Sequence, residues 1–311
     1  MNSISLHNEQ FAAITCYFNP CGYRTRELGY QRFVDGLRRQ QVSLWTIEAT
    51  LPGVPNFVAP GPQVVHVELP EHDWLWQKER LLNLLIHRLP QSVTKVAWLD
   101  CDLLFENDEW PKMASQALDT WPVIQPFNFV HWLGPNDERP HFEGITDRRA
   151  GVAYVAMHYP QRATDFRICA PGIAWAARRE LLNQHGIYER AIIGSGDTLT
   201  TLGFYGWFKH GHLNFCSASA KHDALQYIYK LHRDVRGYVG YLPTAVAHIW
   251  HGSHQNRLYQ QRHQLLRELD FDPQRHLAYD PVTGLLRWTP ETPSAIKTHV
   301  QQYFRLRKED G

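Results

Sequence analysis

The sequence has little of three things: paired cysteines, charge of one sign and long apolar runs. Its 5 cysteines form no CxxC pair, which argues against zinc ribbons and thioredoxin-type chemistry. The 32 basic and 31 acidic side chains leave a net charge of +1, so no global charge favours nucleic acid or a membrane. No run approaches the ~18 apolar residues of a membrane span. We therefore expect a cytoplasmic protein with no membrane association and no obligate protein partner.

What the chain does have is length and aromatic side chains. Its 311 residues suffice for one large domain with a sizeable core. Aromatic residues make up 13% of it, including 11 Trp, which is more than a core of this size requires. We expect some of them to line a binding surface for flat or ring-shaped ligands.

Apolar runs and helical periodicity alternate over the first hundred residues, which argues for a parallel, doubly wound α/β sheet. Strands are predicted at 11–18, 41–49, 63–69 and 95–100, and helices at 26–40 and 74–89. Further along we predict helices at 110–120 and 218–235, strands at 122–127 and 241–250, and a strand or turn into a helix at 169–182. The stretch 128–168 is predicted to be a long irregular loop, which is usually functional or mobile.

The segment VAWLDCDLLF places two acids directly after a buried strand. In an extended segment, Asp100 and Asp102 point to the same side, with Cys101 turned away. Two neighbouring carboxylates at a buried strand end need a compensating partner. Ligands bind at the carboxyl ends of strands in such sheets, and carboxylate oxygens suit Mg²⁺ or Mn²⁺. The alternative to a metal site is a purely structural role, in which the strand simply ends here and one of the two acids caps a helix.

Three other motifs carry candidate side chains. HIWHG follows a predicted strand and supplies His248 and His251, which suit a metal site or simple backbone hydrogen bonds. GSGD holds Asp197 in a glycine turn, as a general base or merely a helix N-cap. WQKERLLN opens a helix with basic and amide groups that suit a diphosphate or form a solvated face: Lys78, Arg80 and Asn83.

Taken together, these motifs resemble the metal-dependent glycosyltransferases of the GT-A fold over nearly the whole chain. The resemblance implies a Rossmann-like mixed sheet flanked by helices in a single large domain. FAAITCYFNP resembles the first strand, which receives the uridine of a nucleotide sugar, and DCDLLF resembles the DxD motif. VAHIWH resembles the strand end of polypeptide N-acetylgalactosaminyltransferase-like enzymes, and the GSGD segment stands where inverting members carry a catalytic base.

The resemblance implies a role for each matching residue. Asp100, Asp102 and His248 would bind Mn²⁺ or Mg²⁺, and Asp197 would be the catalytic base. The donor, a UDP-sugar, would be bound by a second set that shares Asp100 with the first: Thr15, Tyr17, Asn19, Arg24, Lys78, Arg80, Asn83, Asp100, Gly172 and His251. Residues 1–127 would form the nucleotide-sugar-binding half, and residues 128–311 the acceptor and catalytic half with a C-terminal wrap.

The chain more closely resembles a phage and bacterial group of glycosyltransferases associated with TET/base-J oxygenases. That likeness implies 5-hydroxymethylpyrimidine in DNA as acceptor and, for a phage protein, the host cytoplasm. Gly196 departs from the group's inverting relatives, many of which carry Glu before the base. Arginines around the long loop are candidates for contact with DNA: Arg148, Arg149, Arg162, Arg167, Arg178 and Arg179.

Three other functions fit the same residues. A glycosyltransferase acting on a surface saccharide would use the aromatic side chains for sugar stacking. A nucleotidyltransferase also binds Mg²⁺ with carboxylates on an α/β sheet, but it releases pyrophosphate. A non-catalytic protein would bind UDP with metal and transfer nothing.

Overall fold

A large mixed sheet runs through the centre of the computed structural model, which describes residues 10–69, 73–137 and 148–311. The strand order is β11-β6-β10-β4-β1-β2-β3. The bounds of these strands are β1 Phe11–Phe18, β2 Leu44–Thr50, β3 Val64–Glu68, β4 Lys95–Leu99, β6 Val123–Gln125, β10 Ala174–Arg178 and β11 Val239–Tyr241. β10 runs antiparallel to both β4 and β6, whereas β1 is parallel to β2 and β4.

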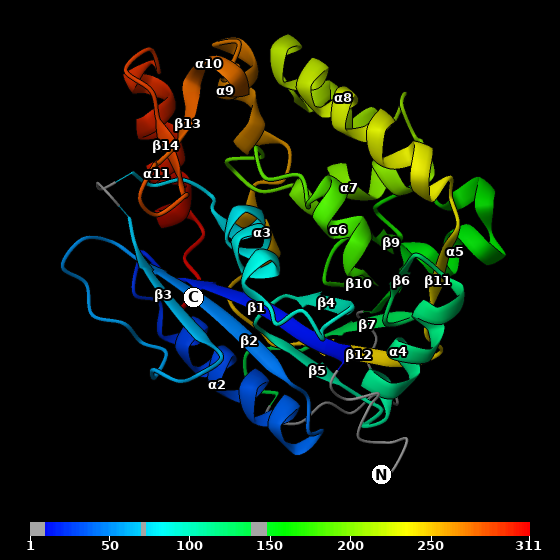
Figure 1. Ribbon diagram of the computed structural model, residues 1–311. Helices are drawn as coiled ribbons and strands as arrows, with labels where there is room; N and C mark the ends of the chain where they lie inside the picture. The colour runs from blue at the N-terminus through cyan, green and yellow to red at the C-terminus, as the bar shows by residue number, and fades with distance from the viewer. Residues whose placement is uncertain (1–9, 70–72, 138–147) are drawn as a thin grey trace.

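Helices cover both faces of this sheet (Figure 1). Successive side chains of a strand point to opposite faces. In β4, Ala97 and Leu99 pack with one set of helices, while Val96 and Trp98 pack with the other. The bounds are α2 Arg24–Arg39 and α4 Trp110–Thr120 on the first face, and α3 Lys78–Arg88 and α6 Arg179–His185 on the second.

A smaller five-stranded sheet, in the order β5-β12-β7-β8-β9, continues from the end of β4. Its strands are β5 Leu103–Phe105, β7 Phe129–Trp132, β8 Arg148–Gly151, β9 Cys169–Ala170 and β12 Ala245–His248. Both sheets therefore meet at the turn that holds Asp100 and Asp102. The hairpin β13 Leu277–Tyr279 with β14 Leu286–Trp288 precedes the last helix, α11 Ser294–Leu306. The remaining helices are α5 Val152–His158, α7 Gly196–Tyr205, α8 Ala218–Val235, α9 Gln264–Glu268 and α10 Pro273–His276.

The predicted α/β class, with a mixed sheet flanked by helices, is confirmed. The parallel sheet predicted from the first hundred residues is confirmed there, since β1 is parallel to β2 and β4, and β2 is parallel to β3. Later in the chain, β10 returns antiparallel beside β4 and makes the whole sheet mixed. The long irregular loop is also wrong in its described parts, which contain β7, β8 and α5; its residues 138–147 lie outside the described residues. The strand predicted at 241–250 is split between β11 and β12, which belong to different sheets.

Within the described residues, no helix is both long enough and apolar enough to cross a membrane.

Candidate functional site

The two acids after β4 lie in a turn and point to different partners. Asp100 N donates to Ile173 O at 3.0 Å, and Ile249 N donates to Asp102 O at 2.8 Å, so two separate elements hold the turn. The extended geometry expected for residues 100–102 is therefore wrong: the chain must bend here to pass from the large sheet into β5. The bend sends each carboxylate into its own cluster.

Asp102 lies in the first cluster, with two histidines from the end of β12. Its Oδ2 lies 3.0 Å from His251 Nε2, and its Oδ1 lies 3.5 Å from His248 Nε2. One ligand atom from each of these three residues falls within 4.8 Å of the others. All three are buried, at 4–5% exposed. We call this group the metal-ligand cluster.

The chemistry of the metal-ligand cluster fits a divalent cation. Asp102 Oδ1 and His248 Nδ1 are buried polar atoms for which the described residues supply no hydrogen bond. Burial lowers the pKa of His248 to about 3, so its imidazole is neutral and has a free electron pair. Burial alone would raise the pKa of Asp102, but His248, His251 and Arg26 hold it well below its usual range. A carboxylate and two neutral imidazoles form a donor set that suits a first-row divalent metal.

Asp100 belongs to the second cluster. Lys78, the first residue of α3, places its Nζ 2.5 Å from Asp100 Oδ1 and 2.7 Å from Asp197 Oδ2. Burial opposes the charge on Lys78, but Asp100 and Asp197 outweigh it and raise the pKa of Lys78 well above its usual range. Lys78 thus joins the two acids as a shared cation. We call these three residues the lysine cluster; in it, Asp100 is held by an ammonium group.

Asp197 is fixed by close packing at the start of α7. A Cβ on Gly172 would lie 3.0 Å from Asp197 Oδ2, and a Cβ on Gly196 would lie 2.4 Å from the carboxyl carbon of Glu79. Both glycines are therefore required by close approach. Ser195, at the N-cap of α7, has a φ of +86°, a left-handed conformation that the surrounding packing imposes.

Glu79 is the buried acid that makes Gly196 necessary. It is 1% exposed, and its Oε2 has no hydrogen-bond partner among the described residues. Burial raises the pKa of Glu79 to about 8, against the opposing effect of Lys78. The carboxyl group of Glu79, which comes from α3, thus occupies the space beside Gly196.

Both clusters open into one cavity of about 770 Å³. Ligand sites typically measure about 300–1,000 Å³, so this cavity has the size of a small-molecule site. Eight of the predicted site residues line it: Asn19, Lys78, Asp100, Asp102, Gly172, Asp197, His248 and His251. Aromatic and arginine side chains complete the wall: Phe18, Trp76, Trp132, Phe166, Phe215, Tyr259, Phe304, Arg149, Arg167, Arg257, Arg262 and Arg307.

The other five predicted site residues are not among the described residues that line the cavity: Thr15, Tyr17, Arg24, Arg80 and Asn83. Thr15 Oγ1 donates to Leu99 O across the sheet at 2.8 Å. Tyr17 is 2% exposed. The side chain of Arg24 is 66% exposed and pairs with Glu27 on α2.

Arg80 and Asn83 lie on the far side of α3 from the cavity, although Lys78 lines it. Arg80 contacts Glu189 at 3.2 Å, and Asn83 donates to Ile187 O at 2.8 Å. Each helical residue turns by about 100°, so side chains two and five positions after Lys78 leave its direction.

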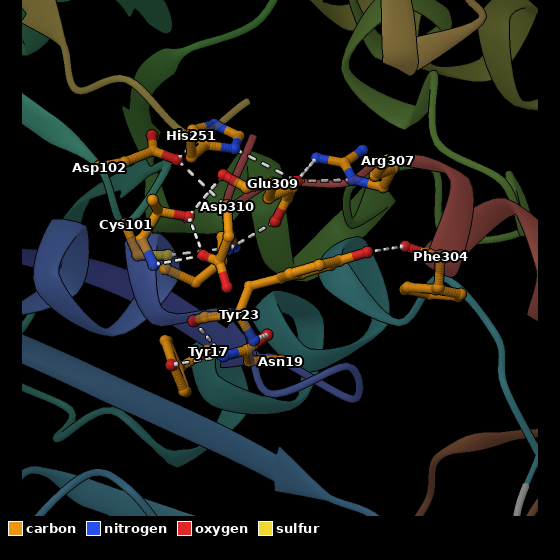
Figure 2. A network of polar contacts seen from close by, with 12 residues as sticks. Tyr17, Asn19, Tyr23, Cys101, Asp102, His251, Phe304, Arg307, Glu309 and Asp310 are labelled. Atoms are coloured by element: carbon orange, nitrogen blue, oxygen red, sulfur yellow. Dashed lines mark hydrogen bonds and ion pairs between the residues drawn. The ribbon is translucent and has the colours of Figure 1, made fainter. Parts of the chain in front are cut away.

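Sequence reasoning missed Arg26, Glu79 and Glu309 as site residues. Arg26 Nη1 lies 3.2 Å from Asp102 Oδ2. Glu309 Oε1 lies 3.2 Å from His251 Nδ1 (Figure 2). No local pattern marks Arg26 or Glu309 as a site residue. Arg26 lies in the charged helix α2, and Glu309 lies in the charged tail after α11. Glu79 stands beside Lys78 in the segment WQKERLLN, where a charged residue is equally typical of a solvated helix face.

Comparison with known proteins gives matches at the level of structure alone. No protein-family description and no curated protein sequence matches the chain. A mutant of Drosophila β1,4-galactosyltransferase 7, in complex with manganese, UDP-Gal and xylobiose, is 12% identical with a TM-score of 0.43, covering 94% of this chain and 98% of that chain. Mannosyl-3-phosphoglycerate synthase from Rubrobacter xylanophilus is 11% identical with a TM-score of 0.40, covering 94% and 92%. TarS from S. aureus is 12% identical with a TM-score of 0.39, covering 72% of each chain.

Since these scores stay below 0.5, the functional argument rests on the geometry of the site.

Proposed function

We propose that the protein is a metal-dependent glycosyltransferase that moves a sugar from a nucleoside-diphosphate sugar, a UDP-sugar, to a hydroxyl acceptor. The observation that carries the proposal is the pair of clusters in one cavity. The metal-ligand cluster suits a diphosphate-bound cation, and the lysine cluster holds a carboxylate suited to proton transfer. The motif resemblance of the sequence supports the same reading.

Asp102, His248 and His251 would hold Mn²⁺ or Mg²⁺. A bound cation would stabilise the negative charge that develops on the leaving diphosphate. Arg26 and Arg257 lie beside the same cluster, with Arg257 Nη2 2.8 Å from His251 Nε2. These guanidinium groups add positive charge on the side of the cavity where the diphosphate would sit.

Asp197 would serve as the general base of an inverting reaction. The acceptor oxygen forms a bond to the anomeric carbon of the donor as the bond to the diphosphate breaks, and the hydroxyl proton moves to Asp197. Lys78 holds Oδ2, so we assign the proton to Oδ1. The Lys78 ammonium also keeps Asp197 and the nearby Asp100 from repelling each other.

For the acceptor we propose 5-hydroxymethylpyrimidine in DNA, a reaction of the cytoplasm, or of the host cytoplasm for a phage protein. Phe166 and Phe215 on the cavity wall offer faces for a flat ring, and Arg149 and Arg167 supply nearby positive charge. A surface saccharide would use the same aromatic faces, so the assay must include both acceptors.

Arg178 and Arg179 do not contribute to such a surface. Arg178 Nε donates to Leu118 O at 2.8 Å, and Arg179 Nη2 donates to Leu89 O at 2.8 Å. These arginines cap the last carbonyl groups of α4 and α3, which explains why their side chains are held against the protein.

The test is a transfer assay with UDP-sugars, Mn²⁺ and four acceptors: 5-hydroxymethylcytosine DNA, 5-hydroxymethyluracil DNA, unmodified DNA and an oligosaccharide. We expect UDP release and a mass gain of one sugar on hydroxymethylated DNA only, with a rate that falls steeply with salt. Asp197→Asn should lower the rate about 10²–10⁴-fold and leave Mn²⁺ and UDP binding unchanged. Transfer to the oligosaccharide would contradict the DNA acceptor, and pyrophosphate release from a nucleoside triphosphate would contradict glycosyl transfer itself.

A further inference from the structure

The end of the chain returns to the metal-ligand cluster (Figure 2). In the last turn of α11, Phe304 O and Arg305 O each accept a hydrogen bond from Tyr23 OH at 3.0 Å. Asp310 accepts from the amides of Arg24 and Thr25 at 3.1 and 2.8 Å, and so caps the start of α2. The last residues are thus docked on both sides of the site.

Glu309 is the tail residue that reaches the cluster itself. It is 4% exposed, and its Oε1 lies 3.2 Å from His251 Nδ1. The same oxygen accepts from Arg307 Nε at 2.6 Å, and Oε2 lies 3.5 Å from Arg26 Nε. A Cβ on Gly252, whose φ is +85°, would lie 2.9 Å from Glu309 Cα, so glycine is required where the tail crosses the segment after His251.

The hydrogen bonds around His251 decide which of its nitrogens carries the proton. Arg257 can only donate, and its Nη2 lies 2.8 Å from His251 Nε2 and 3.4 Å from Nδ1, so the shorter contact assigns Nε2 as the acceptor. The proton therefore lies on Nδ1, where the Glu309 carboxylate accepts it. The electron pair on Nε2 then faces Asp102 Oδ2 at 3.0 Å. His251 Nε2 and Asp102 Oδ2 are then two hydrogen-bond acceptors in a buried site, and a metal ion between them would satisfy both.

We propose that Glu309 is a positioning residue of the metal site, which makes the C-terminal tail part of the active centre. Glu309 holds His251 in the tautomer whose Nε2 carries no proton, so a metal can take the electron pair that Arg257 contacts in its absence, and the charge of Glu309 makes that nitrogen a stronger ligand. The inference rests on the cation site of the proposed function. It adds that the site is incomplete without the tail residue, although Asp102, His248 and His251 are all more than fifty residues away from it.

A purely structural role for Glu309 is the competing explanation. Glu309 also neutralises two buried cations, Arg26 and Arg307, so its loss perturbs tail docking as well as His251. Asp310 provides a matched control, because it is the neighbouring anchor of the tail and contacts α2. Asp310→Ala loosens docking and leaves the contact between Glu309 and His251 in place.

The experiment measures Mn²⁺ affinity by electron paramagnetic resonance, with and without UDP, for the full chain and its Glu309→Ala, Glu309→Gln, Asp310→Ala and Asp102→Ala variants. Loss of an outer-sphere partner typically costs about 10–100-fold in metal affinity, and we expect that range for Glu309→Ala. Glu309→Gln, whose amide oxygen can still accept the Nδ1 proton, should lose less. Asp310→Ala should stay within about twofold of the unmodified protein, since its loss touches no ligand.

A second readout is the ¹⁵N spectrum of the His251 ring in metal-free protein. We expect a protonated Nδ1 in the unmodified protein and in Asp310→Ala, and a loss of that preference in Glu309→Ala. Thermal unfolding of each variant checks that the fold is intact.

The outcomes separate the two proposals. Loss of Mn²⁺ binding in Asp102→Ala with unchanged binding in Glu309→Ala would overturn the role of Glu309 and keep the metal site. An equal loss in Asp310→Ala and Glu309→Ala would also overturn it, because docking alone would then explain both. If the unmodified protein binds no Mn²⁺ with or without UDP, the cation site itself is wrong.

Discussion

Asp100 and Asp102 are separated by one residue, yet they have opposite surroundings. Asp102 faces two imidazoles, and His248, His251 and Arg26 hold its pKa well below the usual range against the effect of burial. Asp100 faces Lys78, and burial raises its pKa although Lys78 opposes the shift. One side of the turn is suited to a metal, and the other already has its cation from the protein.

The difference comes from residues far away in the sequence. His248 and His251 arrive at the end of β12, whereas Lys78 and Asp197 arrive at the starts of α3 and α7. A pair of acids after a strand therefore does not determine its own chemistry. The elements that meet the turn decide whether each carboxylate is a ligand or one half of an ion pair.

The strongest way to break this comparison is to remove the cation of the lysine cluster. Lys78→Met leaves Asp100 and Asp197 facing each other, and we expect a loss of about 2–3 kcal/mol in the free energy of unfolding. The side chains are 16–24% exposed, so we place the cost below that of a fully buried pair. Urea unfolding measures it.

The surface pair of Lys112 and Glu109 gives the control, and Lys112→Met should change stability by less than about 0.5 kcal/mol. Adding Asp100→Asn to Lys78→Met should recover part of the loss. Equal stability of Lys78→Met and the unmodified protein would show that the lysine cluster contributes nothing.

A smaller effect is expected from a methyl group at Gly196. Its Cβ would lie 2.4 Å from the Glu79 carboxyl carbon, so Gly196→Ala should displace α7 and cost about 1–3 kcal/mol. Transfer should fall because Asp197 moves with α7, while Mn²⁺ affinity should remain, since the metal-ligand cluster lies on other elements. Thermal unfolding and Mn²⁺ titration measure the two effects.

Gly211→Ala is the matched control, because nothing lies within 4 Å of its added Cβ. Glu79→Ala combined with Gly196→Ala should restore stability relative to Gly196→Ala alone. Failure of that rescue would mean that Glu79 is not what limits the space at Gly196.

The last effect concerns pH, and it sets Glu79 and Asp102 in opposition. Burial raises the pKa of Glu79 to about 8, so the folded protein holds a proton that the unfolded chain releases above its ordinary value of 4.5. This group therefore makes the folded state less stable as pH rises from about 5 to 8. The lowered pKa of Asp102 acts in the other direction, with stability lost at acid pH.

Glu79→Gln removes the first contribution. Relative to the unmodified protein, we expect its free energy of unfolding to rise between pH 5 and pH 8. One proton contributes at most about 1.4 kcal/mol per pH unit, which sets the upper limit of the gain. The control is Glu268→Gln, at an exposed position of α9, which should leave the pH dependence of stability unchanged. An unchanged pH dependence in Glu79→Gln would show that Glu79 is ionised throughout this range.

Local patterns of the sequence predicted the elements that carry the site. The apolar run before Asp100 is β4, because both faces of that strand are buried, and the periodicity after Arg24 is α2, because that helix buries one face. Asp102 and His248 were predicted as metal ligands together, and the structure brings them within 3.5 Å. They meet because Asp102 directly precedes β5 and His248 ends β12, the antiparallel neighbour of β5, whereas Asp100, the third predicted ligand, faces Lys78.

Local patterns could not predict contacts between residues of elements that lie far apart in the sequence. Glu309 stands in a charged tail whose docking depends on Tyr23 and on the space beside Gly252. Lys78, Arg80 and Asn83 look alike as polar groups on one helix, and only the packing of α3 selects Lys78 for the cavity. The split of 241–250 into β11 and β12 depends in the same way on which sheet each piece meets.

The most direct test is a thermal-shift measurement with Mn²⁺ and UDP on the unmodified protein, Asp102→Ala and Asp100→Asn. A ligand at a hundred times its dissociation constant adds about 2.7 kcal/mol of stability, which is a clear shift. We predict a shift that requires both Mn²⁺ and UDP, is lost in Asp102→Ala and is retained in Asp100→Asn. Equal loss in both variants would contradict the division of the two acids, and no shift in the unmodified protein would contradict the transferase itself.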